Sequence, residues 1–260
     1  MSQIEAPWAL ITGASGGLGV ELARGLAARR INVVLVARRE APMRVLAADL
    51  AHRWGVLTLV EVLDLSQPGS AQVLQRQLEL QGVEPEILIN NAGSGLGGLF
   101  VEQDPQRLRA MLQLDIVTLS ELSLVFGKRM VARGNGLILL VGSTAAYQPT
   151  PMTAAYGAAK AFVLSLGEAL HAELAPRVGV TVLSPGLMDT GFADVSGYVP
   201  PASVRRTILS PVRVAQIGLD ALFARKSSVI PGGLNKVLAF CSRLMPRNTL
   251  AELVLRGSRS

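Results

Sequence analysis

Tyr156 and Lys160 are four positions apart in the segment Tyr-Gly-Ala-Ala-Lys, and Ser143 precedes the tyrosine by thirteen residues. A spacing of four places two side chains on the same face of a helix. An ammonium group beside a phenol favours the phenolate, so we expect the pKa of Tyr156 to lie below its usual value of about 10. Such a tyrosine can exchange a proton with a substrate oxygen near neutral pH.

Ser143 ends an apolar run that starts at Leu137 and is typical of a buried strand. Its hydroxyl is therefore expected at the C-terminal end of a strand, where open α/β sheets bind their ligands. A Tyr-x-x-x-Lys spacing alone is weak evidence, because it occurs by chance on many helices. The N-terminal segment gives it more weight.

That N-terminal segment combines a strand, a glycine turn and a helix. The apolar residues Trp8 to Thr12 lead into Gly13, Gly16, Gly17 and Gly19, and the helical pattern after them places Leu18, Leu22, Ala23 and Leu26 on one face. Glycines allow close approach of a pyrophosphate, and the helix N-terminus offers free N–H groups. The alternative interpretation is an ordinary tight turn between a strand and a helix.

Taken together, these motifs resemble the signature of the short-chain dehydrogenases/reductases, in the branch of short single-domain enzymes. The resemblance rests on Thr12-Gly-Ala-Ser-Gly-Gly-Leu-Gly19, Asn90-Asn-Ala-Gly93, Ser143, Tyr156, Lys160 and Pro185-Gly186, and it covers roughly residues 6–231. It implies a Rossmann-like domain that uses NAD(P)(H) to interconvert carbonyls and alcohols.

The resemblance also implies roles for individual residues. Ser143 would bind the substrate carbonyl, Tyr156 would protonate its oxygen, and Lys160 would lower the pKa of the tyrosine and hold the nicotinamide ribose. The expected cofactor-binding residues are Gly13, Ser15, Gly16, Gly17, Leu18, Gly19, Asp64, Leu65, Asn91, Ala92, Gly93, Tyr156, Lys160, Pro185, Gly186 and Thr190.

The chain departs from the family at Asp115, which stands where an asparagine normally supports a water chain to the lysine. An aspartate has a similar shape but no N–H₂ donor, and a buried carboxylate needs a partner or a proton. Asp115 could pair with Lys160 and keep the relay, weaken catalysis, or lie on a helix surface with no catalytic link.

The residues at the end of the expected second strand predict the cofactor preference. NAD-binding proteins usually have an acid there, whereas an arginine accommodates the 2′-phosphate of NADP. Here Ala37 is followed by Arg38 and Arg39, and a guanidinium can bind a phosphate with two hydrogen bonds. We therefore predict NADP(H), with Arg38 as the phosphate ligand and Arg39 in support. The alternative is a solvated arginine pair. Asp64 is either the residue at the adenine edge or a turn acid.

The chain alternates strands and helices, which predicts an α/β fold: a single Rossmann-like, doubly wound parallel sheet of about seven strands with helices on both faces. After Trp8–Thr12, the expected strands are Asn32–Ala37, Leu57–Leu63, Glu86–Asn90, Gly136–Gly142, Val178–Ser184 and Ser228–Pro231. Helices are expected at about 17–29, 41–54, 69–81, 105–132, 152–175 and 211–225. Residues 1–260 form one domain, with a substrate lid at about 186–210 and a C-terminal helical segment at about 233–260.

Composition agrees with one α/β domain, because 50% of the 260 residues are hydrophobic and few are aromatic. The single cysteine, Cys241, excludes a disulfide framework, and no metal site is expected, since His52 and His171 lie on predicted helix surfaces. The net charge of +6 is dispersed, which argues against nucleic-acid binding. No apolar run approaches the length of a membrane span and no signal peptide is evident, so we expect a cytoplasmic protein.

Several functional alternatives stay open. The apolar residues of the expected lid favour a bulky or apolar ketone, such as a 3-oxoacyl, steroid-like or polyketide-like substrate. A non-catalytic NADP-binding sensor or scaffold would have the same fold, whereas an epimerase of the extended branch needs a larger C-terminal domain. The basic, amphipathic C-terminal segment could cap a pocket, rest on a membrane surface or pack on a twin subunit. A homodimer or homotetramer is expected.

Overall fold

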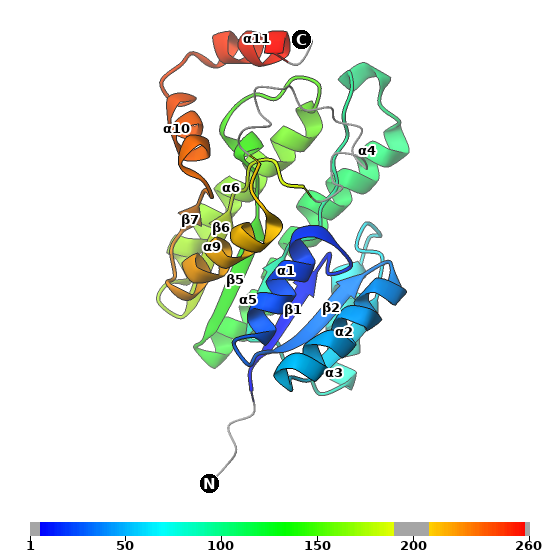
Figure 1. Ribbon diagram of the computed structural model, residues 1–260. Coiled ribbons are helices and arrows are strands. Elements are labelled where there is room, and N and C mark those ends of the chain that lie inside the picture. The colour runs from blue at the N-terminus through cyan, green and yellow to red at the C-terminus, as the bar shows by residue number, and fades with distance from the viewer. Residues whose placement is uncertain (1–5, 190–207, 258–260) are drawn as a thin grey trace.

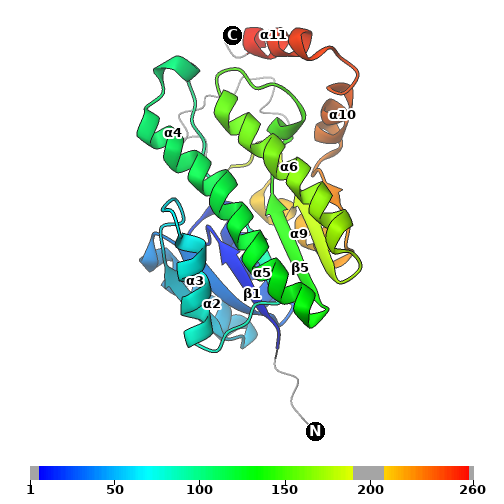
Figure 2. The ribbon, with the colours of Figure 1, turned by 180° about the vertical axis from the view of Figure 1, so that it is seen from behind.

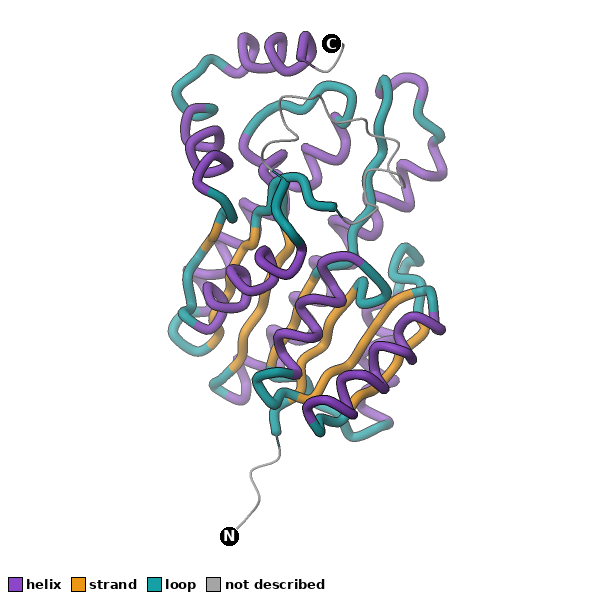
Figure 3. The backbone as a smooth tube through the Cα atoms, in the orientation of Figure 1, coloured by secondary structure: helices purple, strands orange, loops and turns teal. Residues whose placement is uncertain are grey.

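The sheet has seven parallel strands and lies between two layers of helices (Figures 1, 2 and 3). The computed structural model describes residues 6–189 and 208–257, so Thr190 and most of the expected lid lie outside the described residues. The strand order is β3-β2-β1-β4-β5-β6-β7. The strands are β1 Trp8–Thr12, β2 Asn32–Ala37, β3 Thr58–Val62, β4 Ile87–Asn90, β5 Gly136–Val141, β6 Val178–Leu183 and β7 Ser228–Val229.

Helices α1 to α9 lie between successive strands and cover both faces of the sheet, whereas α10 and α11 follow the last strand. They are α1 Gly17–Ala27, α2 Glu40–Trp54, α3 Ser70–Leu80, α4 Pro105–Leu112, α5 Leu119–Arg133, α6 Ala154–Leu174, α9 Pro211–Phe223, α10 Gly233–Cys241 and α11 Arg247–Gly257. Short 3₁₀ turns, η1 Phe100–Glu102 and η3 Thr144–Tyr147, follow β4 and β5. The predicted fold class is therefore confirmed.

Alternation along each strand explains why both faces are covered. Ile11 and Leu35 belong to a core cluster shared with α1, α2 and α9, whereas Leu10 and Val34 belong to a second cluster shared with α3, α5 and α6. Successive side chains of a strand point to opposite faces, so a strand that is apolar at every position needs helices on both sides. Figure 1 shows the first helix layer and Figure 2 the second.

Strand β1 lies between β2 and β4, so the chain winds away from it in both directions. The connections after β1 and β4 therefore leave in opposite directions, which opens a crevice at the C-terminal edge of the sheet. The glycine turn after β1 and the Asn-Asn-Ala-Gly segment after β4 both reach this edge.

The helical stretch Pro105–Arg133 contains a segment of π-helix, η2 Gln113–Thr118, between α4 and α5. Among the described residues, this stretch is long and apolar enough to cross a membrane by length and composition, contrary to the expectation that no apolar run approaches that length. Leu119, Leu122, Phe126 and Met130 of this stretch pack in the core against the sheet. Part of its apolar surface is therefore buried within the domain.

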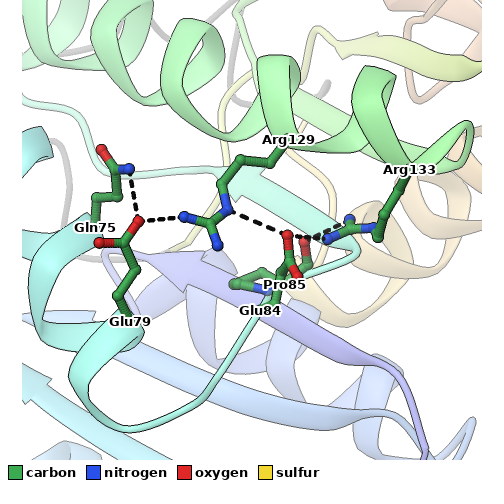
Figure 4. A network of polar contacts seen from close by, with 6 residues as sticks. All are labelled: Gln75, Glu79, Glu84, Pro85, Arg129 and Arg133. Carbon is green, nitrogen blue, oxygen red and sulfur yellow. Dashed lines mark hydrogen bonds and ion pairs between the residues drawn. The ribbon is translucent and has the colours of Figure 1, made fainter.

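An ion-pair network joins α3 to α5 at the opposite edge of the sheet (Figure 4). Arg129 contacts Glu79, and its Nε lies 3.1 Å from Glu84 Oε1. Arg133 lies 2.8 Å from the same Glu84 oxygen and donates a hydrogen bond to the carbonyl of Pro85. The network fixes the end of α5, the element that continues from the π-helical segment.

Candidate active site

Helix α6 presents Tyr156 and Lys160 on one face, as their spacing predicts. Lys160 Nζ lies 5.6 Å from the centroid of the Tyr156 ring, and the lysine is 4% exposed. Tyr156 is enclosed by protein but keeps part of its surface accessible. Lys160 Nζ also donates a hydrogen bond of 3.3 Å to the carbonyl of Val141, the last residue of β5. The ammonium group is therefore anchored at the C-terminal edge of the sheet.

Ser143 lies two residues beyond β5, where it begins the 3₁₀ turn η3. Its Oγ accepts a hydrogen bond of 3.1 Å from Ala145 N–H, which orients the side chain. A side-chain hydrogen bond links Ser143 to Tyr156. The structure thus brings Ser143, Tyr156 and Lys160 together from two elements.

Asp115 joins the same group from the π-helical segment η2. Its side chain is fully buried, and its Oδ2 lies 3.3 Å from Lys160 Nζ. Its Oδ1 accepts a hydrogen bond of 2.9 Å from the backbone of Ser94. The interpretation of Asp115 as a surface acid is wrong, because the carboxylate is the buried counter-ion of the lysine.

Gly93 allows this close approach. A Cβ atom at this position would lie 3.2 Å from Lys160 Nζ and 3.4 Å from either oxygen of Asp115. A side chain there would crowd the ion pair. The glycine at the end of the Asn-Asn-Ala-Gly segment therefore leaves space for the buried charges.

The pKa of Tyr156 is raised above its usual value, contrary to the expectation from its spacing to Lys160. Burial is the main cause, since it disfavours the phenolate, and the Asp115 carboxylate acts in the same direction. The Lys160 ammonium and the Ser143 hydrogen bond oppose this shift without overcoming it. Spacing identifies a neighbouring charge, but it does not reveal burial or a counter-ion.

The lysine and the aspartate are coupled. Burial lowers the pKa of Lys160, but the negative charge of Asp115 and the neighbouring Tyr156 raise it, and the net direction is upward. Burial raises the pKa of Asp115, and the Lys160 ammonium partly offsets this shift. The pair therefore titrates as a unit.

The glycine turn fits a dinucleotide phosphate. Helix α1 starts directly after Gly16, and no side chain caps its first N–H groups. Gly13 adopts a φ of +69°, and a Cβ on Gly19 would overlap the carbonyl of Gly13. These features leave free donors and a bare backbone surface, as a pyrophosphate requires.

Thr12 ties the turn to the next strand, although sequence reasoning gave it no separate role. Its Oγ1 donates to the Ile89 carbonyl and accepts from the backbone N–H groups of Asn91 and Ala92, at 3.0 and 2.9 Å. The Asn91 amide donates to the Thr12 carbonyl at 2.8 Å. Asn91 therefore holds β1 and β4 together at the crevice.

The two arginines after β2 differ in their neighbours. The guanidinium of Arg39 donates to the carbonyl and hydroxyl of Ser15, at 3.0 and 3.2 Å, and so lies against the glycine turn. Arg38 is exposed and interacts electrostatically with Asp64. Asp64 itself accepts from the backbone and hydroxyl of Ser66, which is the geometry of a turn acid.

The remaining predicted residues lie on the same edge or in the core beneath it. Leu18 and Leu65 are buried core residues. The Pro185 carbonyl accepts from Thr144 N–H at 2.9 Å, which joins the loop after β6 to the loop of Ser143. Gly186 packs against the buried amide of Asn235, a contact that no sequence motif indicated. Among the described residues, no group of acidic, histidine or cysteine side chains could hold a metal.

Residues 7–197 match the family model described as short chain dehydrogenase. The chain belongs to the short-chain dehydrogenase/reductase family. A very-long-chain 3-oxoacyl-CoA reductase of Podospora anserina is 35% identical over 82% of this chain and 64% of its own length. The chain thus spans less than two thirds of the length of the first curated relatives that it matches.

Solved structures of short-chain dehydrogenases resemble the fold of this chain. An enzyme from Sphingobium yanoikuyae in complex with NADPH has a TM-score of 0.82 and 30% identity, over 92% of this chain and 93% of that one. A bulky-bulky ketone specific alcohol dehydrogenase from Comamonas testosteroni has a TM-score of 0.78 and 29% identity, over 92% and 91% of the two chains. Both neighbours share the fold of this chain, and the first of them is bound to NADPH.

Proposed function

We propose that this protein is an NADP(H)-dependent oxidoreductase that interconverts an apolar or bulky ketone and its alcohol. The observation that carries the proposal is the convergence of Ser143, Tyr156 and Lys160 at the C-terminal edge of the sheet, beside the glycine turn. When bound, NADPH supplies the hydride. The backbone of the glycine turn would hold its pyrophosphate, and Arg38 and Arg39 would hold its 2′-phosphate.

The protein residues supply binding and the proton. Ser143 would donate a hydrogen bond to the carbonyl oxygen and hold it beside the Tyr156 hydroxyl, and Tyr156 would donate its proton to that oxygen. Because burial raises its pKa, Tyr156 is protonated through neutral pH, which suits it to act as an acid in ketone reduction. Lys160 would stabilise the phenolate that remains, and the coupled pair of Lys160 and Asp115 would pass a proton back to it.

An apolar substrate is supported by the loop that follows Gly93. Gly98 N–H donates to the Met152 carbonyl at 2.8 Å, so this loop lies beside the segment that leads into Tyr156. Its Leu99, Phe100 and Val101 are exposed, which is unusual for three consecutive large apolar residues. The names of the Comamonas and Podospora relatives also indicate large ketone substrates.

Turnover of a ketone panel with NADPH tests the proposal. The panel contains a long-chain 3-oxoacyl thioester, a steroid ketone, a bulky aryl ketone and a small sugar, and we expect the apolar members to react fastest. Absence of turnover with every ketone, combined with tight NADPH binding, would support a non-catalytic sensor or scaffold instead.

The variant Tyr156→Phe removes only the transferable proton. We expect its kcat to fall by a factor of at least about a hundred with little change in NADPH affinity, because general acid catalysis is lost. Tyr147→Phe, which removes a hydroxyl from the neighbouring η3 turn, is the matched control and should keep its activity. Near-normal turnover of Tyr156→Phe would place the chemistry elsewhere.

A further inference from the structure

Helix α10 turns its apolar side outward. The residues that it buries are Asn235 and Ala239, followed by Ser242 just beyond its end, and two of these three are polar. Its outward side carries Leu234, Val237, Leu238 and Phe240, continued by Leu244. Phe240 is 62% and Leu244 is 72% exposed. A surface helix normally shows the reverse arrangement, so this face is suited to an apolar partner.

The inner side of α10 is fixed to the loops of the active site. The amide of Asn235 packs on Gly186 and donates a hydrogen bond of 2.9 Å to the Pro231 carbonyl. The Ser242 hydroxyl donates to the Tyr147 carbonyl at 3.1 Å. The outward orientation of the apolar residues therefore follows from specific polar contacts on the opposite side of the helix.

The charged residues of the segment that contains α10 have one sign. Every charged residue between Asp220 and Glu252 is basic. Lys236 lies on α10, Arg247 begins α11, and the Arg243 guanidinium lies over the ring of Tyr147. A second copy docked on the same face by a two-fold axis would bring these cations together without acids from this segment to neutralise them. A surface of anionic phospholipid offers both the apolar interior and the negative charge that this face matches.

The position of the face agrees with such a surface. Helices α10 and α11 lie at the end of the molecule toward which the strands run, on the same side as the active-site edge of the sheet (Figures 1 and 2). A lipid surface that contacts α10 would therefore lie beside the active site, from which an apolar substrate could enter.

We propose that the outward face of α10, together with Lys236 on this helix and Arg247 at the start of α11, binds the surface of an anionic phospholipid membrane. The apolar side chains enter the boundary between head groups and acyl chains, and the cations contact the lipid phosphates. This binding does not depend on the proposed reaction. For a cytoplasmic protein, the anionic inner leaflet is the corresponding surface.

The test is co-sedimentation of the full chain with vesicles of phosphatidylcholine, with or without phosphatidylglycerol. We expect binding to the anionic vesicles to be at least about tenfold stronger and to weaken as salt is added, because screening reduces the attraction of surface charges. Equal binding to both vesicles, or no binding to the anionic ones, would overturn the proposal.

Two double variants, each with a matched control, separate the apolar and ionic contributions to vesicle binding. Phe240→Ser with Leu244→Ser should reduce binding roughly tenfold or more, because two large apolar side chains no longer leave water. Val45→Ser with Leu80→Ser, at sites that are 72% and 80% exposed on α2 and α3, is the matched control. Lys236→Gln with Arg247→Gln should reduce binding to anionic vesicles by roughly tenfold, whereas Arg53→Gln with Lys128→Gln should not.

Two other outcomes of these tests would contradict membrane binding by α10. If the α10 variant keeps wild-type vesicle binding, this face is not the membrane site. If the wild-type chain is an oligomer that the same variant dissociates, without vesicle binding, the face belongs to a second copy. Turnover of a soluble ketone by each variant reports folding and catalysis separately, so failure of this proposal is distinguishable from failure of the proposed function.

Discussion

Lys160 sits at the centre of the site, with the carboxylate of Asp115 at 3.3 Å, the Val141 carbonyl at 3.3 Å and the ring of Tyr156 beside it. Asp115 neutralises part of the positive charge that would otherwise favour the phenolate of Tyr156. This explains why burial prevails and the pKa of the tyrosine is raised. An asparagine at this position would leave the lysine charge uncompensated.

Asp115→Asn should therefore lower the pKa values of both Lys160 and Tyr156, since the carboxylate raises each of them. We expect the variant to keep or increase its reductase activity near neutral pH. Its activity should decline at a lower pH than that of the wild type, because a tyrosine that ionises earlier stops donating a proton earlier. In the oxidation direction the rise of activity with pH should also move to lower pH.

The measurement is kcat/KM between about pH 5 and pH 10, where the profile reports the acid and base of the free enzyme. Asp220→Asn, which removes an exposed carboxylate from α9, is the control and should leave the profile unchanged. Superimposable profiles for wild type and Asp115→Asn would refute the coupling.

We propose that the two arginines after β2 set the choice of cofactor. We expect NADPH to bind at least about tenfold tighter than NADH, which corresponds to about 1.4 kcal/mol, because no acid repels the 2′-phosphate. Titration of Arg38→Ala and Arg39→Ala with both cofactors measures how much each side chain contributes to this preference. Arg39→Ala should also loosen the glycine turn, because Ser15 loses its hydrogen bonds. Equal affinities in the wild type, or a preference that survives both substitutions, would contradict the assignment.

At the scale of single residues, the sequence predicts which side chains lie close together but not their protonation states. The motif spacing brings Ser143, Tyr156 and Lys160 to one place, as the structure shows. The upward pKa shift of Tyr156 could not be predicted, because it depends on burial and on a counter-ion from another element. The contact of Arg39 with Ser15 could not be predicted either, because the sequence of two adjacent arginines does not show where each side chain points.

At the scale of elements, the glycine turn and α1 tolerate little change. A Cβ at Gly19 would overlap the Gly13 carbonyl and would lie 2.8 Å from the Asn91 amide, and both belong to the contacts that hold β1 beside β4. The backbone cannot move there without disturbing the crevice.

Gly19→Ala should therefore reduce stability by about 1–3 kcal/mol, the usual range for overpacking, and weaken NADPH binding more than tenfold. Chemical denaturation and cofactor titration measure the two effects. Gly82→Ala is a useful contrast, because its Cβ would meet nothing within 4 Å, although its φ of +69° adds strain. It should lose stability without losing cofactor affinity. Unchanged affinity in Gly19→Ala would argue against close approach of the phosphate at this turn.

The elements themselves were largely predictable from apolar periodicity. The strands Trp8–Thr12 and Asn32–Ala37 have the predicted bounds, and the other five strands differ from the prediction by one or two residues at their ends. The π-helical segment Gln113–Thr118 was not predictable, because a helical apolar pattern over 105–132 does not distinguish one widened turn. That turn carries Asp115, so the site depends on a detail of the backbone that the pattern does not contain.

For the whole molecule, α5 and α6 carry exposed apolar residues on the side away from the sheet. Leu124 is 57% and Phe162 is 39% exposed. Ala154 and Ala158 of α6 are also exposed. Small residues allow another helix to approach closely, so this side is suited to a second copy of the chain.

We therefore expect light scattering to give a mass of at least twice 27.4 kDa. Leu124→Glu with Phe162→Glu should produce the monomer, because two charges would be buried without partners in an interface between copies. Leu80→Glu, at an 80% exposed site on α3, should leave the mass unchanged. Phe240→Ser with Leu244→Ser should also leave it unchanged, since α10 is assigned to the membrane rather than to a partner subunit. A monomeric wild type, or an oligomer that only the α10 variant dissociates, would require the two apolar surfaces to be reassigned.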